Sequence, residues 1–118
     1  MRNISFALTT QQFKTRIKTV TRRMGWLNLK VGDVLCGVEK GQGLRPGEKL
    51  ARLGPIKVTD VRREPLRLML DDLDYGFAET VREGFPGSTP SEFVEFFCRS
   101  HKGCTPNSEV TRIEYAYL

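Results

Sequence analysis

The chain has 118 residues, a length that suits one domain with a single hydrophobic core, and its 39% hydrophobic and 28% charged residues exclude a membrane-embedded protein, a collagen-like fibre and a highly charged disordered chain. The formal net charge of +5 is unevenly distributed, because residues 1–63 hold 14 Lys and Arg against 4 Asp and Glu, whereas residues 64–118 hold 5 against 10. If folding gathers the basic half on one face, that face attracts phosphate groups, so the charge favours a nucleic-acid or nucleotide ligand.

The sequence carries no signal for export or membrane insertion. No apolar run approaches the roughly 18 residues of a transmembrane helix, and the N-terminal stretch lacks the apolar segment of a signal peptide. Cys36, Cys98 and Cys104 are an odd number of cysteines, which fits thiols kept reduced in the cytosol. We therefore expect a cytoplasmic protein with no disulfide framework and no membrane partner.

The first half of the chain predicts mainly strands. Alternating or β-branched stretches predict strands over 4–8, 18–23, 34–38 and 55–63, the last of them ended by Pro65. Thr9 followed three residues later by Gln12 has the spacing of a capping box and predicts a short helix over 11–17.

The second half predicts two helices and a terminal strand, over 75–83, from Pro90 to near Gly103, and over 109–117. Asp74 is the expected cap of the first helix, and Thr89 with Glu92 predicts a capping box for the second. Strands at both ends with helices between them predict a single domain over residues 1–118, a small, mostly antiparallel α+β barrel flanked by short helices.

Residues 14–23 hold five cations and no anion: Lys14, Arg16, Lys18, Arg22 and Arg23. In an extended segment Lys18 and Arg22 point to one face while Thr19 and Thr21 point to the other, so joint use of Lys18 and Thr21 requires a kink. The alternative interpretation is a solvated edge strand, whose charges prevent aggregation.

The run Lys-Thr-Val-Thr-Arg-Arg over 18–23, followed by Val-Gly-Asp at 31–33 and Glu-Gly-Phe at 83–85, resembles the ASCH domain of the PUA-like superfamily. The resemblance covers nearly the whole chain in the same order. It implies a small β-barrel with a cleft beside the first helix, and it is likened to RNA-binding domains. One branch of similar size is an amidohydrolase that removes the acetyl group from acetylcytidine, and a related branch suggests ribonuclease activity.

The resemblance also implies roles for individual residues. The Lys and Thr of the amidohydrolase branch fall on Lys18 and Thr21, and its Glu falls on Glu83, with Glu79 one helical turn earlier as the alternative. Thr21 is then the nucleophile, Lys18 the base and Glu83 the acid. A lysine serves as the base only if burial or a neighbouring cation such as Arg22 lowers its pKa. The other interpretation of Glu83 is a solvent-exposed helix residue.

The stretch 39–54 is an insert relative to the ASCH pattern. Its glycines do not follow the dinucleotide-binding fingerprint, so we expect no nucleotide cofactor. One interpretation is that its backbone N–H groups, together with Lys40, Arg45 and Lys49, wrap a phosphate or an RNA backbone, and the other is a flexible hairpin loop.

Two further groups of residues invite a functional interpretation. Cys98, His101 and Cys104 have metal-ligand spacing with Cys36 as a conceivable fourth ligand, but no second paired-ligand motif exists and we predict no metal site. Trp26 either stacks on a base at the cleft mouth or packs under the barrel. Three phenylalanines at helical spacing are assigned to the core: Phe93, Phe96 and Phe97.

The leading hypothesis is an ASCH-type domain that binds RNA or a nucleoside in a basic cleft, with DNA as an alternative ligand. The cleft is formed by Lys18, Thr21, Arg22 and the glycine-rich loop. The other expected ligand-binding residues are Lys14, Arg16, Thr19, Arg23, Trp26, Lys40 and Arg45. The rival hypotheses are the acetylcytidine-type amidohydrolase and a ribonuclease, with a pure scaffold as the remaining class.

Overall fold

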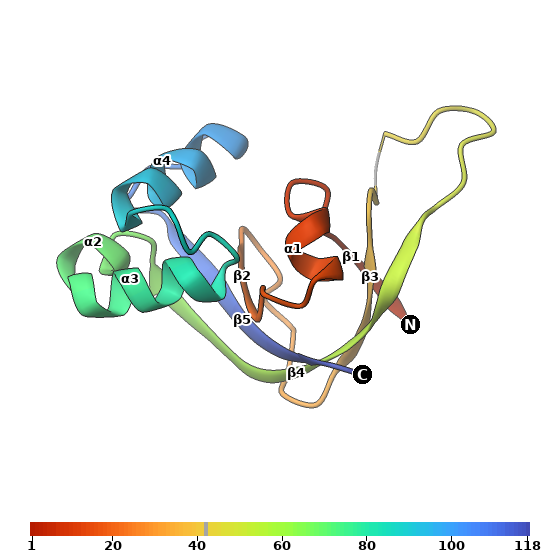
Figure 1. Cartoon of the computed structure of the whole chain (residues 1–118), viewed down its shortest axis with the longest axis horizontal. Coiled ribbons are helices and arrows are strands. Elements are labelled where there is room, and N and C mark those ends of the chain that lie inside the picture. Colours follow the sequence, from red (N-terminus) through yellow and green to blue (C-terminus); the bar gives the residue numbers. More distant parts are fainter. Residues whose placement is uncertain (42) are drawn as a thin grey trace.

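A computed structural model describes residues 1–41 and 43–118 and contains a five-stranded sheet with four helices (Figure 1). The strands are β1 (Arg2–Ser5), β2 (Val20–Arg23), β3 (Val34–Val38), β4 (Arg52–Pro65) and β5 (Glu109–Tyr117), and the helices are α1 (Thr10–Lys14), α2 (Leu68–Asp71), α3 (Leu73–Arg82) and α4 (Pro90–Ser100). The α+β class is therefore confirmed. No helix in the described part of the chain is long and apolar enough to cross a membrane.

The sheet is mostly antiparallel and strongly curled, and its strand order is β1-β3-β4-β5-β2. β1 and β3 are parallel, whereas β3–β4, β4–β5 and β2–β5 are antiparallel. β4 and β5 are the long central strands, and a register shift between Val58 and Asp60 in β4 adds the local twist expected of a bulge. The sheet curls into half a barrel, with β1 and β2 at its two edges.

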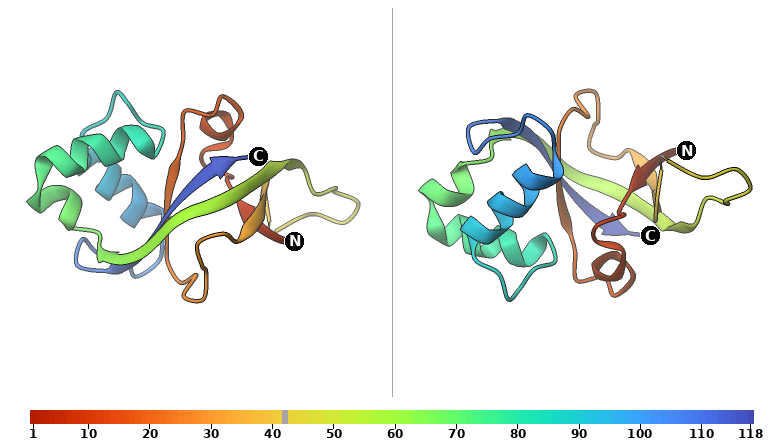
Figure 2. Two further views of the ribbon diagram at one scale, coloured as in Figure 1. Left: turned by 90° about the horizontal axis from the view of Figure 1, so that it is seen from below. Right: turned by 90° about the horizontal axis from the view of Figure 1, so that it is seen from above.

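Two separate apolar cores pack against the curled sheet, and β5 contributes residues to both. The first core surrounds Phe6, Phe13 and Tyr115 at the end of the sheet that holds α1. The second core surrounds Met69 and Phe97 at the end covered by α2, α3 and α4, as the two views of Figure 2 show. The length of the chain predicts one core, and the structure has two.

Several predicted element boundaries are wrong. The first strand ends at Ser5, and Leu8 is exposed. α1 ends at Lys14 because Arg16 takes a left-handed backbone conformation with φ of 61°, and Thr9 makes no side-chain capping bond. α3 is capped by Asp72, which accepts from the Tyr75 N–H, rather than by Asp74.

Helix α4 begins as predicted. The Thr89 side chain accepts a hydrogen bond from the Glu92 N–H, and the Glu92 carboxylate accepts one from the Thr89 N–H, so the capping box is complete. Pro90 takes the first helical position, where its missing N–H costs nothing. The helix ends at Ser100, three residues earlier than expected, and His101 follows in an extended conformation.

Helix α3 is turned with its polar side inward. Glu79 and Thr80 are buried, whereas the large apolar residues Leu73, Phe77 and Val81 are about half exposed. The usual pattern of an amphipathic surface helix is the reverse. The buried polar side is explained by the ion pairs described below.

A close approach of α2 and α3 depends on Gly76. A methyl group built at this glycine would lie 1.9 Å from the Met69 carbonyl oxygen, a contact that requires the backbone to move. We expect Gly76→Ala to lower the free energy of unfolding by about 2 kcal/mol despite the better helix propensity of alanine. Urea denaturation followed by tryptophan fluorescence measures this loss. Gly87→Ala is the matched control, because a methyl group there meets open space, and an equal effect of both variants would contradict the explanation.

Candidate functional site

A cavity of about 440 Å³ lies between the segment that follows β1, the segment that leads into β2, and helix α4. Its lining residues come from three stretches of the chain: Ser5–Thr9; Lys18 with Thr21–Arg23; and Glu83, Phe85, Phe93, Phe96, Phe97, Ser100 and His101. One side of the cavity is therefore polar and charged, and the other is mainly aromatic.

Lys18 and Glu83 form a buried ion pair on the polar side. The Lys18 ammonium group donates to Glu83 Oε1 at 2.7 Å and to the Glu83 backbone carbonyl at 2.9 Å. Gly84, with φ of 99°, lets the end of α3 approach this segment closely, since a side chain there would meet Gln12 at 2.8 Å. Burial lowers the pKa of Lys18 below its ordinary value, and the adjacent Glu83 only partly offsets this shift.

Thr21 is a buried residue of β2 that lines the same cavity. Its hydroxyl oxygen accepts a hydrogen bond from Arg23 Nε at 3.0 Å. The Arg23 guanidinium lies 5.0 Å from the centre of the Phe6 ring, and burial lowers its pKa to about 10, so Arg23 stays protonated at neutral pH. A cationic donor on the hydroxyl oxygen favours the alkoxide form of Thr21.

Arg22 links the cavity to a network of buried charges on α3, β4 and β5. It donates to Glu83 Oε2 at 3.1 Å, to Glu79 Oε1 at 2.7 Å and to Glu64 Oε2 at 3.1 Å. Its side chain and that of Glu79 are fully buried. Arg22 thus holds three carboxylates together in the interior, one of which lines the cavity.

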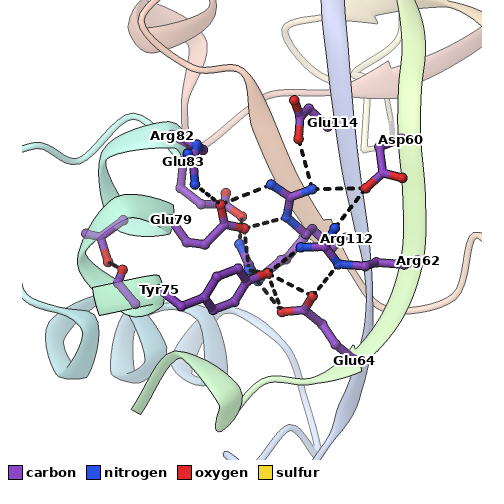
Figure 3. A network of polar contacts seen from close by, with 12 residues as sticks. Asp60, Arg62, Glu64, Tyr75, Glu79, Arg82, Glu83, Arg112 and Glu114 are labelled. Carbon is purple, nitrogen blue, oxygen red and sulfur yellow. Dashed lines mark hydrogen bonds and ion pairs between the residues drawn. The ribbon is translucent and has the colours of Figure 1, made fainter. Parts of the chain in front are cut away.

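Figure 3 shows how the network continues away from the cavity. Arg112 of β5 contacts Glu79 through two nitrogens and also pairs with Asp60 and Glu114 at its outer end. Burial alone would raise the pKa of Glu79, but hydrogen bonds from Arg112 and Arg22 outweigh it and lower the pKa to about 2. Glu79 is therefore ionised at neutral pH and serves the network rather than the cavity.

The part of the cavity that α4 lines is mainly aromatic. Phe93 and Phe97 belong to the second core and also line the cavity, as does the half-buried Phe96. The imidazole of His101 stacks on Phe97, with ring centres 4.1 Å apart and planes at 21°. Flat apolar surfaces of this kind suit a planar ring in the ligand.

The structure brings five of the sequence-predicted site residues together around the cavity: Lys18, Thr21, Arg22, Arg23 and Glu83. No bulge in a strand is needed to combine Lys18 with Thr21, because Lys18 precedes β2 and follows the left-handed turn at Arg16. Glu79, the alternative to Glu83, lies behind the cavity wall among the arginines.

Six predicted ligand-binding residues do not line the cavity: Lys14, Arg16, Thr19, Trp26, Lys40 and Arg45. The Arg16 guanidinium lies over the Tyr117 ring at 5.2 Å, and Trp26 packs against the first core with the Arg2 guanidinium 3.9 Å above its ring. Thr19 is held by backbone bonds to Arg82 and Tyr115.

The glycine-rich insert takes no part in the cavity as far as it is described. It connects β3 with β4 and projects from the opposite end of the sheet in Figure 1. Lys40 pairs with Glu48 across the loop at 3.7 Å, and the Arg45 N–H donates to the same carboxylate. Gln42, which belongs to the predicted phosphate-binding stretch, lies outside the described residues.

Sequence reasoning missed the aromatic wall and His101. Helical spacing predicts Phe96 in the core, yet it is half-buried at the cavity. Cys98 and Cys104 lie with their sulfur atoms 3.3 Å apart, and His101 between them in sequence turns its Nδ1 to the Phe97 carbonyl oxygen at 2.8 Å. Cys36 is buried on β3, away from this group. The signal that existed for His101 was its position at the end of an amphipathic helix.

Comparisons with known proteins give information on the fold alone. No family model and no curated protein matches the chain. Among solved structures, the hypothetical protein PH0355 is similar over the full length of both chains, with a TM-score of 0.67 at 16% sequence identity. Protein EF3133 from Enterococcus faecalis V583, of the DUF984 family, is similar over 92% of this chain and 69% of its own, with a TM-score of 0.56 at 15% identity. At these identities the likeness concerns the fold alone.

Proposed function

We propose that this chain is an ASCH-type domain of PUA-like fold whose cavity binds one nucleoside, free or at the end of an RNA strand. The observation that carries the proposal is the pairing of an aromatic wall with a wall of buried charged donors across one cavity. A volume of about 440 Å³ falls within the range of small-molecule sites. A nucleobase fits these walls because its faces stack on aromatic rings while its edge accepts and donates hydrogen bonds.

The charge distribution supports a nucleoside more than a long RNA strand. Six of the predicted ligand-binding residues lie outside the cavity, five of them basic or aromatic. Two of the three cations that line the cavity, Lys18 and Arg22, are already paired with Glu83. Binding in the cavity is therefore expected to depend weakly on salt, unlike binding of a polyanion to a basic surface.

Calorimetric titration with N4-acetylcytidine and cytidine tests this proposal. We expect Phe96→Ala to weaken binding about 10-fold, since stacking of a base on an aromatic side chain contributes on the order of 1–3 kcal/mol. Phe77→Ala is the matched control, because Phe77 is an exposed phenylalanine on α3 outside the cavity. Absence of nucleoside binding by the folded wild-type protein would refute the proposal.

A second candidate function is hydrolysis of the acyl group of an acylated cytidine, and the surroundings of Thr21 favour it. The Thr21 oxygen would form a bond to the acyl carbon while Lys18 takes the hydroxyl proton, and the bond from carbon to the exocyclic nitrogen would break as that nitrogen takes the proton. Water would then hydrolyse the threonyl ester, releasing the acid and restoring the hydroxyl. Burial of Lys18 favours the neutral amine that a base requires.

In this scheme Glu83 acts through Lys18. Both of its carboxylate oxygens are occupied by cationic donors, Lys18 on one and Arg22 on the other. Glu83 therefore positions the Lys18 amino nitrogen beside the cavity, a role different from the acid that the resemblance implies. Incubation with N4-acetylcytidine, followed by chromatography for cytidine, tests whether the acyl group is removed, and the variants that separate the roles of these residues are described in the Discussion.

A further inference from the structure

Two neighbouring side chains at the end of α4, Ser100 and His101, line the cavity. Each of them donates its polar hydrogen to a backbone carbonyl oxygen of the helix. The Ser100 hydroxyl donates to the Phe96 carbonyl oxygen at 2.8 Å, and His101 Nδ1 lies 2.8 Å from the Phe97 carbonyl oxygen. Because a carbonyl oxygen only accepts, Nδ1 carries the hydrogen of this bond. Each side chain is thus bound to the backbone carbonyl four residues earlier, in the last turn of the helix.

This arrangement leaves hydrogen-bond acceptors at this wall. In the neutral imidazole of His101 the second nitrogen, Nε2, carries a lone pair, and the Ser100 oxygen retains lone pairs after donating its hydrogen. Among the described residues neither His101 Nε2 nor the Ser100 oxygen receives a hydrogen bond from the protein. Both residues line the cavity, Ser100 exposed and His101 half-buried.

The C-terminal end of α4 also favours a ligand group that donates hydrogen bonds. The C-terminal end of an α-helix carries a partial negative charge, which favours groups that present hydrogen and disfavours anions. α4 has 11 residues, and its last turn carries Ser100. A phosphate placed against this end would face acceptors and the negative pole of the helix.

We propose that Ser100 and His101 form a subsite that accepts hydrogen bonds from the two adjacent hydroxyls of a ribose, so that the cavity selects a ribonucleoside over a deoxyribonucleoside. This inference rests on the proposed nucleoside binding and specifies which nucleoside. The base lies between the aromatic wall and the Lys18–Glu83 side, and the sugar lies at the end of α4. A 3′- or 2′-phosphate replaces one of the donors and is excluded from this subsite.

The test is a binding cycle between side chains and ligand hydroxyls. Cytidine, 2′-deoxycytidine and 3′-deoxycytidine are titrated into the wild type, Ser100→Ala and His101→Phe, the last of which keeps an aromatic ring on Phe97. We expect the wild type to bind each deoxy compound about 5-fold more weakly than cytidine, the effect of losing one hydrogen bond of ordinary strength. Each variant should bind cytidine more weakly than the wild type does, by a similar factor. For one of the two deoxy compounds, the one that lacks the hydroxyl bound by the replaced side chain, the variant and the wild type should have equal affinity.

Two further variants separate recognition from a structural role. His101→Gln keeps an acceptor and should restore part of the preference for cytidine, whereas a merely structural role gives no such recovery. Ser91→Ala, on the first turn of the same helix and outside the cavity, should leave all three affinities unchanged. Equal losses for cytidine and both deoxy compounds in every variant would overturn the ribose subsite and leave nucleoside binding standing. No binding of any nucleoside by the wild type would overturn both proposals.

Discussion

Replacing Arg22 with methionine is expected to lower the free energy of unfolding by about 3–5 kcal/mol, the cost of removing one partner from a buried ion pair. Arg22 is fully buried, and its guanidinium contacts three carboxylates in the interior: Glu64, Glu79 and Glu83. Methionine fills much of the same volume but supplies no donor and no charge. The three carboxylates then repel one another in a medium that solvates them poorly.

Urea denaturation followed by the fluorescence of Trp26, the single tryptophan, measures the loss. Arg99→Met is the matched control, because its ion pair with Glu95 is exposed and should be worth under about 0.5 kcal/mol.

The stability that Arg22 contributes should also depend on pH. The pKa of Glu79 is lowered to about 2 in the folded protein, so its contribution is present above its ordinary pKa of 4.5 and is lost as the pH falls towards 2. The deficit of the Arg22 variant should shrink between pH 5 and pH 3, and a deficit that does not change with pH would contradict this account.

For the proposed deacylation, Thr21→Val is expected to reduce turnover at least about 1000-fold, because valine has the same shape as threonine but no hydroxyl to form the acyl intermediate. Turnover is measured as cytidine released from N4-acetylcytidine. Binding of the substrate should change little, since the valine occupies the same space in β2. A variant that retains turnover would show that another group attacks the acyl carbon.

Replacement of Lys18, the proposed base, gives a second test of the same reaction. Lys18→Met should lower turnover by about 100-fold to 10,000-fold, the range expected for loss of a general base. The pKa of Lys18 is lowered by burial, so the neutral amine forms, and turnover of the wild type rises with pH, in a range below the ordinary lysine value of 10.5. The variant should lose this rise. Lys30→Met, an exposed lysine outside the cavity, is the matched control and should keep the wild-type profile.

The sequence predicts the end of a helix correctly where side chains a few residues apart cap it. The capping box of α4 is such a case, because Thr89 and Glu92 satisfy each other's backbone without any distant partner. α1 ends and α3 begins at other residues than the local patterns predict. Asp72 rather than Asp74 caps α3, because the short helix α2, which no pattern predicted, ends at Asp71 and α3 begins two residues earlier than expected.

The polar half of the candidate site was predictable, and the aromatic half was not. Lys18, Thr21 and Glu83 follow from the motif that resembles ASCH domains, and the structure places all three at one cavity. Phe96 has the same helical spacing as its core neighbours Phe93 and Phe97, and spacing alone does not distinguish a residue under a helix from one beside a cavity. Burial of Glu79 was equally hidden, since its partner Arg112 is 33 residues away in the sequence.

The charged network lies between the two apolar cores, and β5 contributes residues to both of them. Along β5, Val110 belongs to one core, Arg112 to the network, and Ile113 to the other core. Loss of either core therefore exposes the network to water and weakens the pairing of Arg112 with Glu79, which in turn frees the strands that support the remaining core. We therefore expect the two cores to unfold together in one transition, although a layer of charges lies between them.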